Sequence, residues 1–302
     1  MRLRHIEIFQ AIRQAGSISK AAVLLNVSQP SVTKVLQHAE SQLGFALFKR
    51  VKGKLMITPE GLALEREVNR VTVSVEGVRR LAESLRNDTS ATLRIGATPA
   101  LASSLLPAVV TRWSERYENT SCELCSLHSI ELVQNLFMRE IDVAITFRHP
   151  EHPGLDVRPI ATCDLLLLSP ADHWAEAQLK EPLPIEALAG TFLIGMAHTD
   201  PLSSQLGLYL HAVNPPPRTS FKVQTYSLAR SLVEAGAGMA IVDAFTAYEA
   251  SDTRSQIRKL VPTWPITLYA LTRANEPEPH SFGSLFKILE QQAKQMIAAN
   301  ES

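Results

Sequence analysis

The stretch from Ser17 to Gly44 constrains the fold more than any other part of the chain. Its apolar residues recur twice at the i, i+3, i+4, i+7 spacing of a helix. The first run is Ile18, Ala21, Ala22 and Leu25, and the second is Val32, Val35, Leu36, Ala39 and Leu43. Ser28 stands between the runs at a position typical of an N-cap, and Pro30 follows where a first turn tolerates proline. The stretch therefore predicts two short helices that pack through small residues.

The second predicted helix leaves a polar face outside, with no carboxylate before Glu40. That face carries Gln29, Ser31, Thr33, Lys34, Gln37 and His38. A helix-turn-helix places such a face in the major groove of DNA, where the side chains donate to phosphates and base edges. An ordinary solvated helix has a similar composition, so this window alone leaves both interpretations open.

The flanking segments favour the DNA-binding interpretation. A preceding helix, ending near Gly16, is predicted by Leu3, Ile6, Phe9 and Ile12. After Gly44, residues 47–51 and 55–57 read as two strands of a hairpin with a basic tip. Beside a helix-turn-helix such a hairpin is a wing, and it would place Arg50, Lys52 and Lys54 along the DNA backbone.

A long helix follows, from Thr58-Pro59-Glu60 to about Arg86. The threonine fits an N-cap, the proline fits N1, and the carboxylate lies in the first turn. Apolar residues then recur at alternating four- and three-residue steps: Leu64, Val68, Val71, Val75, Val78, Ala82 and Leu85. This heptad spacing predicts a helix about 40 Å long that pairs with its own copy, making a dimer. The alternative is that the seam packs on the chain's own body.

The polar segment 87–90 is the best domain boundary, and strands alternate with helices beyond it. This order predicts a mainly parallel α/β fold in two lobes. The first lobe would contain strands at 93–96, 122–127 and 142–146, with helices at 98–110 and 130–138. The second would contain strands at 165–169, 191–195, 221–224 and 239–242, with helices at 184–188, 200–211 and 227–234. A strand at 266–272 and a helix at 281–298 are expected to return to the first lobe.

Charge and cysteine content restrict the class of protein. The whole chain is neutral, with 30 basic and 30 acidic residues, but residues 1–90 carry a net +6 and the remainder −6. A basic head on an acidic body suits a phosphate-binding module. The start of the sequence does not read as a secretory signal, and no apolar run is long enough for a membrane span. Three cysteines cannot form a full disulfide set, so a reducing cytoplasm is expected.

Three motifs that could indicate a redox, metal or dinucleotide site are better explained as structural. Cys122 and Cys125 lie three apart on a predicted strand, so they should point to opposite faces. His149 and His152 lack a third zinc ligand. The glycines at 236 and 238 follow a helix and precede a strand, the reverse of a dinucleotide fingerprint. The sequence thus predicts no catalytic centre, no metal and no cofactor, and hence no enzyme.

Taken together, these residues resemble the LysR-type transcriptional regulators over nearly the whole chain. The matching segments are LRHIEIFQAI, GSISKAAVLLNVSQPSVTKVLQHAESQLGFALFKR and MITPEG. The resemblance implies a winged helix-turn-helix over 1–58, a linker and dimerisation helix over 59–88, and an effector-binding domain over 91–302. That domain would be two-lobed, similar to periplasmic binding proteins, with lobe I at about 91–161 and 267–302 and lobe II at about 162–266. Lys34 stands where many members carry arginine.

The resemblance also implies partners: double-stranded promoter DNA, a small-molecule effector, further copies of the chain up to a homotetramer, and RNA polymerase as a candidate. LRHIEIF and VQTYSLARSLVEAGAGMAIVDAFTA look most like the branch with the lysine-biosynthesis and opine-catabolism regulators. That likeness suggests an amino acid or an amino-acid derivative as effector. The competing hypothesis is a solute-binding or enzymatic α/β protein whose N-terminal helices only mediate assembly, but assembly would not need a polar recognition face beside a basic hairpin.

The effector is expected where strand ends meet helix starts in the two lobes. Helix N-termini offer unpaired N–H groups and a partial positive charge, so they favour a carboxylate. The expected residues are Thr98, Pro99, Ser129, Thr146, Thr199, Asp200, Tyr226 and Ser227. Asp200 would pair with an amine of the effector. Each single hydroxyl could instead be only an N-cap, and the recurrence in both lobes favours the binding site.

Overall fold

The computed structural model describes residues 1–51, 54–86, 92–118, 120–197, 201–276 and 280–300. The chain divides into two compact units, Met1–Thr89 and Ser90–Ser302, and each is described by itself. The division falls in the polar segment 87–90, whose residues lie outside the described ranges.

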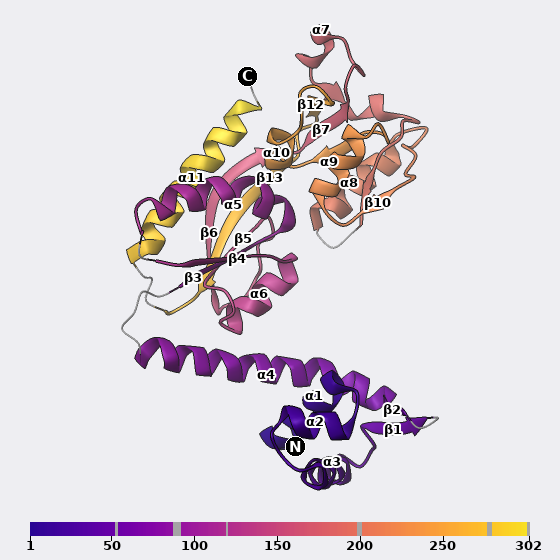
Figure 1. Cartoon of the computed structure of the whole chain (residues 1–302). Helices are drawn as coiled ribbons and strands as arrows, with labels where there is room; N and C mark the ends of the chain where they lie inside the picture. Colours follow the sequence, from indigo (N-terminus) through magenta and orange to yellow (C-terminus); the bar gives the residue numbers. More distant parts are fainter. Residues whose placement is uncertain (52–53, 87–91, 119, 198–200, 277–279, 301–302) are drawn as a thin grey trace. The chain divides into compact units, whose positions relative to one another are not determined.

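The first unit is a three-helix core followed by a hairpin and a long helix (Figure 1). Its elements are α1 (Leu3–Ala15), α2 (Ile18–Leu24), α3 (Gln29–Leu43), β1 (Phe48–Val51), β2 (Lys54–Ile57) and α4 (Pro59–Arg86). Ala21 and Ala22 are fully buried, and they let α2 lie close to its neighbours in a core with Phe9 and Val32. The predicted winged helix-turn-helix is confirmed.

The start of α4 is fixed tightly against the hairpin. The Thr58 hydroxyl accepts a hydrogen bond from the Gly61 N–H at 3.0 Å and donates to the Ala46 carbonyl at 2.7 Å, so the predicted N-cap is confirmed. A Cβ at Gly61 would lie 2.5 Å from the Leu47 carbonyl oxygen. Only glycine therefore fits here, and the close approach joins the wing to the long helix.

The heptad seam of α4 divides into two parts. Val68 is 2% exposed and packs with Leu64 against the core of the first unit, so these two residues serve their own domain. This part of the seam prediction is wrong, because the alternative of packing on the chain's own body applies there. Beyond them Val71 is 40% and Val78 is 68% exposed, and Ala82 is exposed as well. The exposed apolar residues remain available to a partner helix.

The second unit contains a five-stranded sheet with the order β4-β3-β5-β13-β6. Its strands are β3 (Leu93–Ala97), β4 (Cys122–Ser126), β5 (Val143–Thr146), β6 (Leu155–Asp164) and β13 (Pro265–Arg273). β3 pairs in parallel with β4 and β5, whereas β13 runs antiparallel to both β5 and β6. The predicted return of the last strand to the first lobe is confirmed, and the sheet is mixed rather than mainly parallel.

Helices cover both faces of this sheet. Alternate residues of β5 face opposite sides: Val143 and Ile145 pack with α5 (Pro99–Ser114) and α11 (His280–Ala299), and Ala144 packs with α6 (Ser129–Phe137). The period of two places one buried layer on each face. This three-layer lobe brings the carboxyl ends of β3, β4 and β5 to one edge.

The second lobe departs more from the prediction. Its main sheet has the order β11-β7-β12-β8, formed by β7 (Leu166–Pro170), β8 (Leu183–Pro184), β11 (Ala240–Val242) and β12 (Ser255–Val261). β7 pairs antiparallel with β11 and β12, so the expected parallel unit is wrong here. A short parallel pair, β9 (Gly195–Met196) and β10 (Lys222–Val223), lies apart, and the predicted strand at 191–195 is otherwise reduced to bridges. The remaining elements are α7 (Glu176–Leu179), the 3₁₀ turn η1 (Ile185–Leu188), α8 (Pro201–Ala212), α9 (Tyr226–Glu234) and α10 (Ala244–Tyr248).

Two strands, β6 and β12, were not predicted, because each contains a residue that is unusual in a strand. In β6, Pro159 lies where the register with β13 shifts, and a bulge is one of the few places where a sheet accepts proline. In β12, Arg258 is 7% exposed: its Nε donates to the Glu181 carbonyl and its guanidinium lies over the Trp174 ring. A buried arginine breaks the apolar pattern by which a strand is recognised.

Candidate DNA interface and effector site

The exposed face of α3 carries the side chains expected to contact DNA. Gln29, Ser31 and Lys34 are exposed, and Thr33 is half-buried. The Lys34 ammonium makes no hydrogen bond or ion pair with any residue in the described ranges, and the same holds for the exposed Arg50 on β1. The opposite stripe of α3 is buried through Val32, Leu36 and Ala39.

Hydrogen bonds within the first unit orient three of these side chains. The Ser19 hydroxyl of α2 donates to the Gln29 amide oxygen at 3.0 Å, which leaves the Gln29 amide N–H groups free to donate outward. Ser31 exchanges a hydrogen bond of 2.8 Å with Ser28, and Thr33 donates to the Gln29 carbonyl at 3.1 Å. The Thr33 hydroxyl is thus already used within its own helix, and Gln29 is the better placed donor.

Glu40, the first carboxylate on α3, is used in hydrogen bonds within the first unit. Its Oε1 accepts hydrogen bonds from the N–H groups of Leu47 and Phe48, at 2.7 and 3.2 Å. The carboxylate fixes the start of the wing to the helix. Lys52 lies outside the described residues, as does the side chain of Lys54, so both stay sequence predictions.

In the first lobe, three expected effector residues meet at one edge of the sheet. The Thr98 N–H donates to the Ile145 carbonyl at 3.1 Å, which joins the ends of β3 and β5. Ser129, the first residue of α6, exchanges a hydrogen bond of 3.0 Å with the buried Thr146. The Thr98 hydroxyl is buried and has no hydrogen-bond partner among the described residues. Pro99 begins α5 beside it.

In the second lobe, the expected residues at the start of α9 are in place. Thr225 is the N-cap, and its hydroxyl accepts a hydrogen bond from the Leu228 N–H at 3.2 Å. Tyr226 and Ser227 follow in the first turn and are half-buried. Thr199 and Asp200 lie outside the described residues. The helices α5, α6 and α9 begin where they were predicted, and α8 begins at Pro201, directly after the two residues that are not described.

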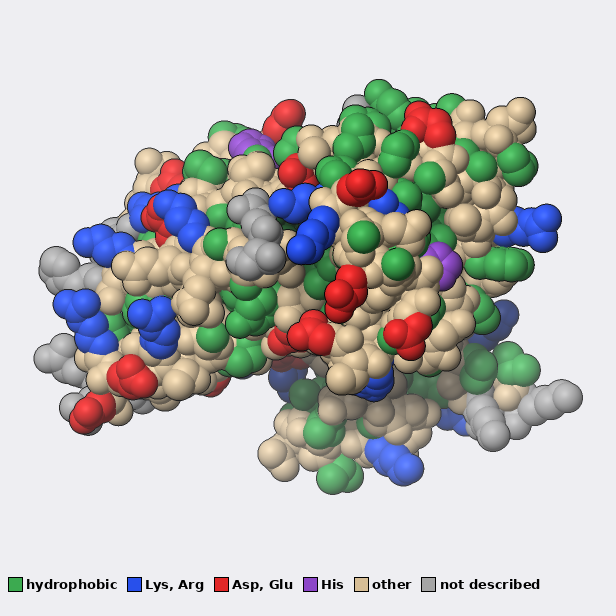
Figure 2. Space-filling view, turned by 90° about the horizontal axis from the view of Figure 1, so that it is seen from above, with side chains coloured by type: hydrophobic (Ala, Val, Ile, Leu, Met, Phe, Trp, Pro, Cys, Tyr) green, Lys and Arg blue, Asp and Glu red, His purple; other side chains and the backbone are tan. Residues whose placement is uncertain are grey.

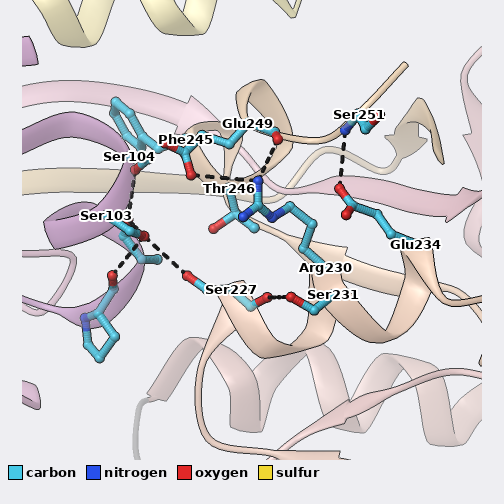
Figure 3. Close-up of polar contacts among 12 residues, drawn as sticks. Ser103, Ser104, Ser227, Arg230, Ser231, Glu234, Phe245, Thr246, Glu249 and Ser251 are labelled. Atoms are coloured by element: carbon cyan, nitrogen blue, oxygen red, sulfur yellow. Dashed lines mark hydrogen bonds and ion pairs between the residues drawn. The ribbon is translucent and has the colours of Figure 1, made fainter. Parts of the chain in front are cut away.

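The two lobes contact each other between α5 and α9 (Figure 3). Ser103 and Ser227 point toward one another, with their hydroxyl oxygens 3.4 Å apart. Behind this contact, Arg230 of α9 donates to the Glu249 carbonyl and lies 3.6 Å from its carboxylate. No local sequence pattern indicated Ser103 or Arg230, because the partner of Ser103 lies 124 residues further along the chain and the partner of Arg230 lies 19 residues further.

A buried carboxylate anchors α10 beside this contact. Asp243 is fully buried, and it accepts hydrogen bonds from the Phe245 and Thr246 N–H groups and from the Thr246 hydroxyl. Burial raises the pKa of Asp243 above its usual value, and these hydrogen bonds oppose the shift. Its role is to cap the helix, since every one of those partners belongs to α10.

The motifs set aside in the sequence have structural surroundings. Cys122 and Cys125 pack into different clusters on opposite faces of the sheet, as expected. Burial raises the pKa of the Cys122 and Cys125 thiols. It raises the pKa of the Cys163 thiol to about 12, so none of the three favours a reactive thiolate. Among the described residues no three His, Cys, Asp or Glu side chains form a metal site, and no helix has the length and apolarity to cross a membrane.

Two surface depressions lie away from the expected effector residues. One, of about 380 Å³, is lined by Phe9, Gln10, Arg13, Gln14, Glu65 and Asn69, and the other, of about 350 Å³, lies over β6, β13 and Phe286. Figure 2 shows a face on which acidic, basic and hydrophobic side chains are interspersed. Among the described side chains on that face, charges of both signs alternate, unlike the single-sign patch that binds nucleic acid.

Comparison with known proteins identifies the family. Residues 3–62 match the model "Bacterial regulatory helix-turn-helix protein, lysR family", and residues 86–294 match "LysR substrate binding domain". The chain is 36% identical to the HTH-type transcriptional regulator DgcR of Pseudoalteromonas sp, over 82% of this chain and 84% of the relative. It is 29% identical to the transcriptional activator protein LysR of Escherichia coli K12, over 91% and 88%.

Solved structures show the same fold. CbnR in complex with its target DNA superposes with a TM-score of 0.69 at 22% identity, covering 97% of this chain and 100% of that one. Full-length BenM gives a TM-score of 0.57 at 23% identity, covering 98% and 97%. The family models and curated relatives are those of transcriptional regulators and not of enzymes. With its winged helix-turn-helix, long helix and two-lobed domain, this chain belongs to the LysR-type transcriptional regulators.

Proposed function

We propose that this regulator reads its operator through α3 and its wing. Gln29, Thr33 and Lys34 approach base edges, and Ser31, Arg50, Lys52 and Lys54 contact phosphates. The observation that carries this proposal is the outward face of α3, on which Gln29 is oriented by Ser19 and Lys34 is unpaired among the described residues. Glu40 adds no repulsion there because it is bonded to the wing.

We further propose a small carboxylate effector, an amino acid or amino-acid derivative, held between the lobes. The buried Thr98 hydroxyl lacks a hydrogen-bond partner among the described residues, and a bound ligand would supply one. The N-termini of α5, α6 and α9 add N–H groups and partial positive charge, which favour a carboxylate. Asp200 is proposed as the partner of an effector amine, with Thr199 beside it.

Assembly and setting complete the proposal. The exposed valines of α4 would pair two chains, and two such dimers would make the tetramer. The protein would act in the cytoplasm on promoter DNA, with RNA polymerase as a further partner. In this proposal residues 1–58 bind DNA, residues 59–88 form the dimerisation helix, and residues 91–302 bind the effector.

Replacing Gln29 with alanine is expected to relax the choice of operator sequence. A bidentate glutamine contact is worth roughly 1–3 kcal/mol of discrimination against a wrong base. Affinities for a set of single-base operator variants, measured by fluorescence anisotropy at fixed salt, would report the ranking. Arg50→Ala is the matched control: it should weaken all variants alike and lower the salt slope by about 0.9. An unchanged ranking with Gln29→Ala would show that α3 is oriented differently.

A further inference from the structure

Two histidines from different helices meet at the edge of the α3 face (helices labelled in Figure 1). His5 lies in the first turn of α1 and is 5% exposed. His38 is exposed on α3, one turn after Lys34. His38 Nδ1 lies 3.2 Å from His5 Nε2, and the ring planes meet edge to face at 65°.

A third partner determines where the protons of this pair lie. The Arg2 backbone N–H donates to His5 Nδ1 at 3.2 Å, so this nitrogen carries no proton. Neutral His5 then carries its proton on Nε2, which donates to His38 Nδ1. Because His38 Nδ1 accepts, the proton of His38 lies on Nε2, the nitrogen that does not contact His5. The chain of donors thus selects one tautomer for each ring.

The electrostatic surroundings favour neutral His5. Burial lowers the pKa of His5, and His38, the amino terminus and Arg2 lower it further. The other charged groups on α1, α2 and α3 are Arg4 and Glu7, which bond each other, Arg13, which bonds Glu65 of α4, and Lys20, Lys34 and Glu40. Glu40 accepts hydrogen bonds from the start of the wing, so its carboxylate is not available to stabilise a positive charge on either histidine.

We propose that His38 donates a hydrogen bond from Nε2 to a DNA phosphate, and that His5 is the positioning residue that holds its tautomer. The inference rests on the proposed placement of α3 in the major groove. His38 lies nine residues after Gln29, about two and a half turns along the helix. Recognition helices contact base edges with their N-terminal residues, so a side chain this far along meets the backbone instead.

A neutral donor has a distinct signature in binding. It adds affinity without releasing a counterion, so it should not contribute to the salt slope, unlike a cation on a phosphate such as Arg50. In the proposed tautomers the His5 Nε2–H group occupies Nδ1 of His38, so Nε2 is the nitrogen of His38 that donates outward.

The first arm of the test removes the donor in the full-length chain. His38→Ala should lower affinity about tenfold for all operator variants alike, with the salt slope unchanged. His38→Gln should restore most of the loss, because its amide can donate from a similar position. Arg50→Ala, at a proposed phosphate contact, is the comparison and should lower the slope by about 0.9. If His38→Ala binds like the native chain while Lys34→Ala and Gln29→Ala are impaired, the inference fails and the placement of α3 stands. If all three bind normally, the placement itself is wrong.

The second arm tests the positioning residue. His5→Phe keeps a ring but removes the donor, so Nδ1 of His38 can bind a proton; the salt slope should then steepen by about 0.9 as pH falls from 8 to 5.5. The double variant His5→Phe with His38→Gln should lose that pH dependence. His5→Gln can accept from Arg2 and donate to His38, so it should behave like the native chain. Thermal melts identify any variant that fails to fold. If His5→Phe does not fold, the results with His5→Gln and His38→Gln decide between the outcomes. A pH-dependent slope in the native chain equal to that of His5→Phe would overturn the positioning role.

Discussion

With Glu at both Val71 and Val75, the protein is expected to become monomeric and to lose about a hundredfold or more in operator affinity. Val71 is 40% exposed and Val75 half-buried on α4, beyond the part of the helix that packs on its own domain. In a pair of these helices the substitutions would place four like charges in an apolar seam. A dimer binds two half-sites at once, and losing this second contact removes a factor of about 10²–10⁴.

Light scattering measures the oligomeric state, and anisotropy with a two-half-site duplex measures the affinity. Val71→Leu with Val75→Leu is the control, because it keeps the seam apolar and should preserve the dimer. Circular dichroism should show that α4 remains helical in both double variants. A Glu variant that stays dimeric would remove α4 as the dimerising element.

Thr98→Ala combined with Ser129→Ala is expected to abolish the effector response while operator binding survives. The Thr98 hydroxyl is buried without a partner in the described part of the chain, and Ser129 begins α6 at the same edge of the sheet. Each would donate to the effector carboxylate, and a hydrogen bond to a charged group is worth about 1.5–3 kcal/mol. Losing two of them should weaken the effector by about a hundredfold or more.

The readout is a titration of effector against the operator complex of each variant. Ser114→Ala is the matched control, because Ser114 ends α5, the helix that Thr98 precedes, and in the described part of the chain its hydroxyl donates to the Thr111 carbonyl. Its response should equal that of the native chain. An unchanged response in the Thr98 and Ser129 double variant would place the effector elsewhere.

Local patterns predicted the first unit well. Periodic apolar residues, Gly16 and Gly44 in left-handed conformation, and the Thr58 cap all act within a few residues of the chain. The second lobe was harder, because β6 contains Pro159 at a bulge and β12 buries Arg258. Whether a proline or an arginine is accepted depends on a neighbouring strand or ring, and neither is visible in a local window.

The candidate sites divide in the same way. The face of α3 follows from helical periodicity, so Gln29 and Lys34 could be named from the sequence. The hydrogen bonds that orient the site join Ser19 to Gln29, Glu40 to Leu47, and Ser103 to Ser227. These pairs depend on how elements pack, and no spacing rule indicates them. The histidine pair belongs to the same class, with 33 residues between its members.

Control of operator binding by a ligand held between the lobes is tested most directly by a thermodynamic cycle on the full-length chain. A thermal-shift screen of amino acids, opines and small carboxylates first selects a ligand. Calorimetry then gives its affinity with and without operator, and anisotropy gives the operator affinity with and without ligand. A regulator requires the two factors to be equal and different from one, and the Thr98→Ala, Ser129→Ala variant should lose both. A ligand that binds equally well with and without operator, and leaves operator affinity unchanged, would contradict control through this site.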